Sequence, residues 1–124
     1  MAASAPHEHR PAEAVPFVGV EVATLSADHL RASLRVTGTV LPSSAPMLTS
    51  VLRTHLASGR RYLRVDLAAA SVTDPEVIQT LVAARRSVSA LGGMLVFDNA
   101  GPRVVDAIRR ATLYVRADQL TSAS

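Results

Sequence analysis

The fold of this chain is decided by one stretch, Tyr62-Leu-Arg-Val-Asp66-Leu-Ala-Ala-Ala-Ser71-Val-Thr-Asp74-Pro-Glu-Val-Ile78. The run from Tyr62 to Leu67 is rich in strand-forming residues and predicts a buried β-strand, and the small residues after it predict a turn. Asp74-Pro75-Glu76 then predicts a helix start, with the aspartate as N-cap and the proline in the first helical position. Such a corner can bind acidic or phosphate groups, because a helix N-terminus has unpaired N–H groups and a positive partial charge. Taken alone, however, these residues favour the plainer interpretation that they start a helix.

Strand and helix patterns alternate over the rest of the chain. Two strand-like stretches, Phe17 to Leu25 and Leu30 to Thr37, flank a turn-prone segment and predict an antiparallel hairpin. Apolar residues at helical spacing predict three helices, which begin near Ser43, after Asp74 and near Pro102. Met94 to Phe97 is expected to form a short buried strand before the last helix.

Short connections between these elements predict right-handed crossovers and parallel pairing of the later strands. The expected fold is therefore α/β, with a mixed sheet of four to five strands that begins with an antiparallel hairpin and is packed with three to four α-helices. The chain has 124 residues, which fits a single domain. We expect a flexible N-terminal tail over residues 1–16, one domain over residues 17–116 and a short C-terminal tail over residues 117–124.

Composition excludes several classes of function. There is no cysteine and no lysine, so thiolate, disulfide and lysine chemistry are absent. The net charge of +3 is spread along the chain and aromatic residues make up only 3%, which does not favour nucleic-acid binding. No apolar run is long enough to span a membrane and no leader peptide precedes the domain, so we expect a cytoplasmic protein without direct membrane insertion.

Histidines do not predict a metal site or a catalytic site. His7-Glu8-His9 lies in the expected tail and lacks a preorganised third ligand, so we expect no metal there. His55 falls on or beside the apolar stripe of its helix, and a hydrogen-bonded histidine at the core edge is favoured over a ligand or a base. No motif indicates a cofactor, and we expect no enzyme activity.

The carboxyl ends of parallel strands share one edge of the sheet, where ligands and partners commonly bind. This places Thr39 to Ser43, Ala68 to Glu76 and Asp98 to Pro102 on one rim.

Several motifs, in this order along the chain, resemble one family. The segment Gly38 to Pro46 is similar to that family's loop before the first helix, with its Ala-Thr-Ala-Pro-like helix start. Val65-Asp66-Leu67 followed by Val72-Thr73-Asp74 is similar to its third strand and signature aspartate. Gly92 to Val96 and Gly101 to Val104 are similar to its fourth strand and third helix start. Over roughly residues 17 to 116 the chain thus resembles the STAS domain family of anti-sigma factor antagonists and sulphate-transporter domains.

The chain differs from the family at the position through which the resembled domains are regulated. In the resembled domains the signature aspartate is followed by a serine that a partner kinase phosphorylates, whereas here Pro75 follows Asp74. Proline has no hydroxyl, so phosphorylation at the family position is excluded. The acidic residues of the loop before the first helix are replaced by Thr39 and Leu41. Asp74 and Glu76 either mimic a permanent phosphate or cap the helix, and capping is favoured because a carboxylate carries less charge.

The resemblance implies a non-catalytic regulator of bacterial transcription that acts by competitive binding to a protein partner, an anti-sigma factor or a kinase-like regulator. The partner-binding residues that we expect are Thr39, Leu41, Ser43, Thr73, Asp74, Pro75, Glu76, Ile78 and Thr80. An alternative within the family is a STAS subunit of an ABC-type membrane transport complex. A third hypothesis is a phosphoacceptor domain with Asp74 as the modified residue, although the chain lacks the acidic pair and the lysine that this chemistry uses. The sequence is also compatible with a homo-oligomer.

Overall fold

The computed structural model describes residues 13–17 and 19–111, which form one mixed sheet with helices packed on it. The strands, in the order in which they pair across the sheet, are β1 (Glu13–Phe17), β2 (Val20–Ala27), β3 (Arg31–Thr39), β4 (Tyr62–Ser71) and β5 (Met94–Asp98). The strands from β1 to β3 pair antiparallel, and those from β3 to β5 pair parallel. The predicted α/β fold, with its hairpin and its parallel later strands, is confirmed.

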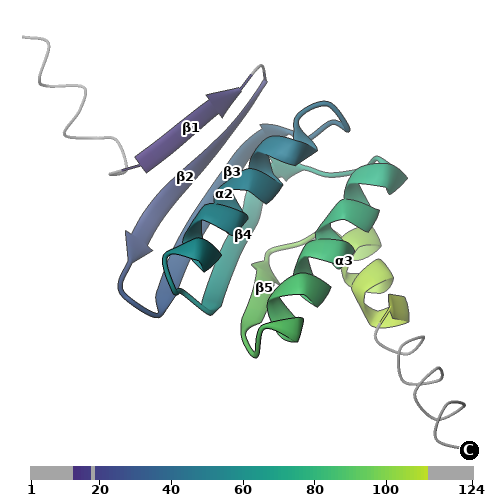
Figure 1. Ribbon diagram of the computed structural model, residues 1–124. Helices are drawn as coiled ribbons and strands as arrows, with labels where there is room; N and C mark the ends of the chain where they lie inside the picture. Colours follow the sequence, from purple (N-terminus) through teal and green to yellow (C-terminus); the bar gives the residue numbers. More distant parts are fainter. Residues whose placement is uncertain (1–12, 18, 112–124) are drawn as a thin grey trace, which may run out of the picture.

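Helices cover one face of this sheet. Helix α2 (Ala45–Ala57) joins β3 to β4, α3 (Pro75–Ala90) joins β4 to β5, and a further helix over residues 102–111 follows β5. Figure 1 shows α2 and α3 in front of the sheet. Alternation along β4 separates the two faces: Leu63, Val65 and Leu67 are buried toward the helices, whereas Tyr62 and Arg64 are exposed on the other face. We call that second face the open face.

The core between sheet and helices is almost entirely aliphatic. Its fully buried side chains come from β2, β3, β4, α3 and the last helix, and include Val22, Leu34, Val36, Leu63, Val65, Val77, Leu81, Val88 and Val104. Close packing of branched side chains of similar size explains how the domain folds with so few aromatic residues.

The first strand corrects the expected N-terminal tail. Residues 13–16 belong to β1, whose backbone pairs with β2 from Glu13 opposite Thr24 to Phe17 opposite Val20. β1 is an edge strand, and Pro16 is tolerated there because one side of an edge strand needs no N–H donor. The lack of periodicity hid this strand in the sequence. The remainder of the expected tail, with His7-Glu8-His9, and residues 117–124 lie outside the described residues.

β4 is longer than predicted, and this corrects the turn expected at the small residues. Ala68 to Ala70 continue the strand, which ends at Ser71. The pairing with β3 shifts by one residue between Arg35–Asp66 and Thr37–Ala69, which marks a β-bulge in β4. The backbone N–H of Ala68 donates to Oδ1 of Asp66 at 2.9 Å, so the aspartate side chain binds the backbone at the bulge.

The interpretation of His55 as a hydrogen-bonded residue at the core edge is confirmed. Its side chain is only 3% exposed and lies between Thr24 and Arg60. Nη1 of Arg60 lies 3.0 Å from Nδ1, and a guanidinium can only donate, so Nδ1 accepts. The neutral ring then carries its proton on Nε2, which donates to Oγ1 of Thr24 at 3.2 Å.

Among the residues that the structure describes, no helix is both long and apolar enough to cross a membrane.

Candidate functional site

The carboxyl ends of β3 and β4 lie level with each other and form a rim. Thr39, the last residue of β3, pairs with Ser71, the last residue of β4. The N–H of Val40 then donates to the carbonyl oxygen of Ser71 at 3.0 Å, which ties together the two loops that follow the strands. We use the name rim for residues 39–44 and 71–76.

Gly38 sets the direction in which the chain enters the rim. Its φ of +103° is unfavourable for residues with a side chain, and a Cβ at this position would overlap the carbonyl oxygen of Gly19. The N–H of Thr39 donates to the same carbonyl at 3.2 Å. A glycine is therefore required here for the close approach of two backbones.

The loop before α2 is held by Ser44, which is buried. Its Oγ accepts from the N–H of Leu41 at 2.9 Å and lies 3.1 Å from the carbonyl oxygen of Leu41, to which it donates. Ser44 is the N-cap residue, next to the predicted helix start near Ser43, but its side chain binds the preceding loop instead of the helix backbone. The side chain of Leu41, in the same loop, is 49% exposed.

The start of α3 has the predicted capping chemistry. Asp74 is the N-cap, and its Oδ1 accepts from the N–H of Glu76 at 2.8 Å. Pro75 is the first helical residue and is exposed, and the exposed Glu76 places a second carboxylate in the first turn. The carboxylate of Asp74 is thus committed to the helix backbone, while that of Glu76 accepts no hydrogen bond recorded among the described residues.

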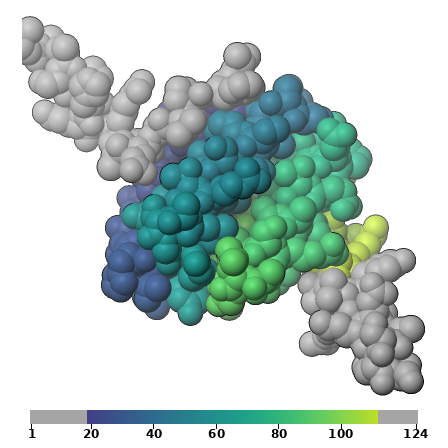
Figure 2. Space-filling model, in the orientation of Figure 1, coloured from purple at the N-terminus to yellow at the C-terminus, as the bar shows by residue number. Residues whose placement is uncertain are grey.

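A hollow of about 470 Å³ extends the rim between α2 and α3. Figure 2 shows the surfaces of these helices, blue to teal for α2 and green for α3, side by side on one face. Two rows of residues at a spacing of four face each other across the hollow: Ala45, Thr49 and Arg53 on α2, and Glu76 and Thr80 on α3. Arg53 and Glu76 do not form an ion pair with each other in the described structure, so both charges are available to a partner.

The structure brings together most of the residues expected to bind a partner. Glu76 and Thr80 line the hollow, and the exposed rim carries Thr39, Leu41, Ser43, Thr73 and Pro75. Thr49 and Arg53 also line the hollow and were not singled out from the sequence, although their spacing of four residues places them on one side of α2.

Ile78 needs a correction. Its side chain is 7% exposed and packs in the hydrophobic core, so it offers almost no surface to a partner. The apolar stripe of α3 is wider than one residue per turn, and Ile78 lies at its buried border beside Val77.

The segment from Asp98 to Pro102, expected on the same rim, lies elsewhere. β5 ends where Asp98 pairs with Asp66, whereas β4 continues for five further residues to Ser71. The loop after β5 therefore meets the bulge of β4 instead of the rim. Nδ2 of Asn99 donates to Oδ1 of Asp66 at 3.0 Å, and Asn99 adopts a φ of +56°, which is tolerated best by glycine and asparagine.

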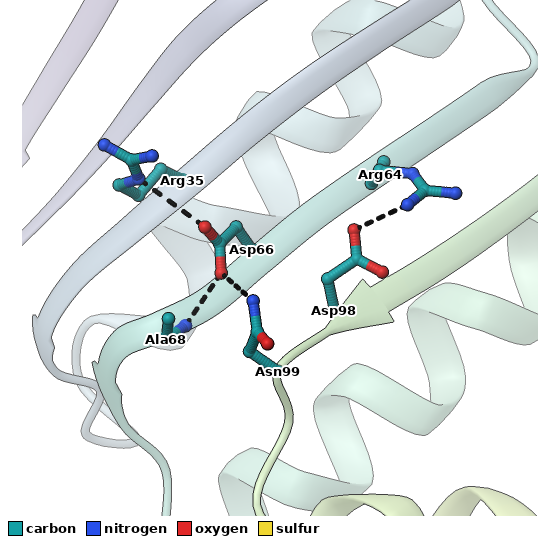
Figure 3. A network of polar contacts seen from close by, with 6 residues as sticks. All are labelled: Arg35, Arg64, Asp66, Ala68, Asp98 and Asn99. Atoms are coloured by element: carbon teal, nitrogen blue, oxygen red, sulfur yellow. Dashed lines mark hydrogen bonds and ion pairs between the residues drawn. The ribbon is translucent and has the colours of Figure 1, made fainter.

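This contact belongs to a polar network on the open face (Figure 3). Nε of Arg35 lies 3.6 Å from Oδ2 of Asp66, and Nη1 of Arg64 donates to Oδ2 of Asp98 at 3.0 Å. The hydrogen bond from Asn99, followed by that from the N–H of Ala68, lowers the pKa of Asp66 below its ordinary value, and the charge of Arg35 acts in the same direction. Asp66 and Asp98 pair across β4 and β5, and each of their carboxylates thus has an arginine guanidinium beside it.

The profile of the STAS domain matches residues 24–116 of this sequence. The chain belongs to the STAS domain family. This match covers the second half of β2, the rest of the described sheet beyond it, the rim, both helices beside the hollow and the last helix. No curated protein matches the chain in sequence.

Solved structures show that this STAS domain has the fold of anti-sigma factor antagonists. It is similar to the antisigma-factor antagonist STAS domain from Rhodobacter sphaeroides, with a TM-score of 0.54 and 19% identity over 64% of this chain and 86% of that one. It is also similar to the anti-sigma factor antagonist SpoIIAA in its unphosphorylated form, with a TM-score of 0.60 and 12% identity over 71% of this chain and 81% of that one. At these identities the likeness concerns the fold alone.

Proposed function

We propose that this STAS domain is a non-catalytic protein-binding regulator of the anti-sigma factor antagonist type. The observation that carries the proposal is the exposed rim, which continues into the hollow between α2 and α3. Membership of the family and the shared fold support the class of partner, an anti-sigma factor or a kinase-like regulator in the cytoplasm of a bacterium. Binding requires no cofactor and no nucleic acid.

The mechanism is competition for the partner. An anti-sigma factor that is occupied by this domain can no longer hold its sigma factor, so the sigma factor is released by mass action. The chemistry of the surface suits a protein partner. The exposed Leu41 offers apolar contact at the rim, while Arg53 and Glu76 offer one charge of each sign in the hollow.

Phosphorylation at the start of α3, which switches binding in the resembled domains, cannot control this interaction. A phosphate would add about −1.5 to −2 charge at the start of α3, but Pro75 has no hydroxyl to carry it. Asp74 caps the helix, so Glu76 is the only carboxylate of this turn that remains for a partner. Control then comes from the amount of the protein, a ligand or a second partner.

The proposal is tested by titrating the domain into purified anti-sigma factors from the same organism, with calorimetry for binding and release of the sigma factor as the functional readout. We expect one of them to bind, and Glu76→Arg combined with Leu41→Asp to weaken binding by at least about tenfold, as for a central contact of an interface. The matched control is Arg86→Glu, an exposed charge reversal further along α3 that does not line the hollow. Absence of binding to every candidate, or equal loss in the control, would contradict the proposal.

Pro75→Ser separates recognition from regulation. Serine is acceptable at the start of a helix, so this variant should fold and bind as the original does. If the partner is a kinase-like regulator, the variant should gain phosphate and lose affinity, while the original chain stays unmodified. Recovery of an ABC-type ATPase instead of an anti-sigma factor would favour the transport-complex hypothesis, and labelled phosphate on Asp74 from a small phosphodonor would favour the phosphoacceptor hypothesis.

A further inference from the structure

A second surface lies on the open face, at the opposite end of the strands from the rim. Here Arg31 and Ser33 of β3, Tyr62 and Arg64 of β4, and Met94 and Val96 of β5 surround a hollow of about 190 Å³. We propose that this surface docks a segment of a second partner protein whose contacting side chains are apolar and acidic. Neither the rim nor the hollow between α2 and α3 includes any of these residues.

The apolar part of the partner is inferred from Tyr62 and Met94. These residues pair directly across β4 and β5, and they are 44% and 59% exposed. Two large apolar side chains standing together on an open sheet are unusual, because exposed apolar residues normally occur singly. Tyrosine, methionine and arginine are also the residue types that are enriched at the centre of protein interfaces.

The acidic part of the partner is inferred from the charges around the hollow. Two arginines line it and no carboxylate does. Arg64 is already paired with Asp98, whereas Arg31 forms no ion pair among the described residues and instead stacks over the Tyr62 ring, 5.9 Å from its centroid. The Oδ1 of the nearby Asp28 accepts from the N–H groups of Leu30 and Arg31 at 2.8 and 2.7 Å; these bonds lower the pKa of Asp28, and the charge of Arg31 acts in the same direction. Asp28 therefore compensates Arg31 only from beyond ion-pair distance, and a carboxylate from a partner would give the guanidinium an ion pair that it lacks among the described residues.

The size of the hollow favours a protein segment over a small molecule. Pockets that enclose small molecules usually exceed about 300 Å³, and this hollow is smaller and open. It has room for one apolar side chain, while the exposed strands around it offer a wider, flat contact. Such a geometry suits the anchor residue of a peptide or of a protein surface.

The two surfaces are far enough apart to be occupied together. Tyr62 begins β4 and Ser71 ends it, which separates their backbones by about 30 Å at the rise of a β-strand. A partner on the open face therefore leaves the rim accessible, and this domain could link two proteins.

The test is a selection of random 12-residue peptides displayed on phage, with the complete chain as bait. We expect enriched peptides to combine a large apolar residue with aspartate or glutamate. In two-dimensional NMR spectra, a selected peptide should shift the amides around Arg31, Tyr62 and Met94 and leave those of Leu41 and Glu76 unchanged.

Two variants make the outcome decisive. Arg31→Glu should weaken binding of a selected peptide by at least about tenfold, which is about 1.4 kcal/mol, and a repeated selection on this variant should enrich lysine and arginine instead. Met94→Ser, an exposed change that should keep the fold, should weaken the same peptide, whereas Glu76→Arg at the rim should not. Any one of four results would overturn the proposal. The selection could enrich no peptides, or enrich peptides without acidic residues. The amide shifts could be confined to the rim, or the charge reversal in Arg31→Glu could leave the preference for acidic peptides unchanged. None of these results depends on whether an anti-sigma factor binds the rim.

Discussion

Replacement of Asp74 tests whether its carboxylate acts as a helix cap or as a charge that a partner reads. In Asp74→Ala the hydrogen bond from the N–H of Glu76, 2.8 Å long, is lost. Loss of an N-cap side chain costs about 0.5 to 2 kcal/mol. Since Glu76 is exposed, its N–H can bind water after the change, so we expect a cost near the middle of that range, about 1 kcal/mol.

Asp74→Asn separates the two roles. Asparagine caps a helix about as well as aspartate but carries no charge. If capping is the role, Asp74→Asn should keep the stability of the original chain to within about 0.3 kcal/mol, apart from a small loss of attraction to the helix dipole.

The assay is urea unfolding followed by circular dichroism at pH 7, with thermal unfolding as a second measurement. For a domain of this size, a loss of 1 kcal/mol lowers the midpoint temperature by about 4 to 8 °C. An unchanged midpoint in Asp74→Ala, or equal destabilisation by alanine and asparagine, would refute the capping argument. Loss of partner binding in Asp74→Asn with intact stability would show instead that the charge is recognised.

Three further predictions concern stability. Gly38→Ala should destabilise the domain by more than about 1 kcal/mol, because its Cβ would overlap the carbonyl of Gly19, whereas Gly101→Ala, with nothing within 4 Å, should leave the urea midpoint nearly unchanged. Ile78→Arg should destabilise strongly or prevent folding, since it buries a charge in the core, while Gln79→Arg on the exposed side of α3 should be tolerated, as measured by the yield of folded protein. The pKa of Asp66 is lower in the folded state than its ordinary value of 3.8, so the stability that its carboxylate contributes is complete at higher pH and is lost as the pH falls through the folded value. The difference in urea midpoint between the original chain and Asp66→Ala should therefore be present at pH 7 and shrink below about pH 3.8. A difference that stays constant with pH would contradict this prediction.

Local chemistry made most of the fold predictable. Asp74 and Pro75 act on the residues next to them, and the N-cap and helix start that they predict are present. The apolar spacing of α2 and α3 likewise identified the faces that pack on the sheet. These signals depend only on a few neighbouring residues.

The errors that concern the strands have a common cause, which is that they depend on pairing between distant residues. Ala68 to Ala70 have turn-like composition, yet they remain in β4 because β3 offers its backbone and Asp66 stabilises the bulge. β1 exists because β2 has a free edge beside it. The early end of β5, which removed Asp98 from the rim, is a matter of register, and no local pattern records the register of two parallel strands.

The unequal lengths of β4 and β5 also bear on how the sheet moves. Beyond Asp66, β4 is flanked on one side by β3 and on the other by no strand that the structure describes. Segments with fewer cross-strand hydrogen bonds open at lower free energy than the centre of a sheet. We therefore expect the last residues of β4 to exchange their amide hydrogens sooner than Leu63 or Val65, and a partner that binds the rim would slow that exchange without changing the shape of the domain.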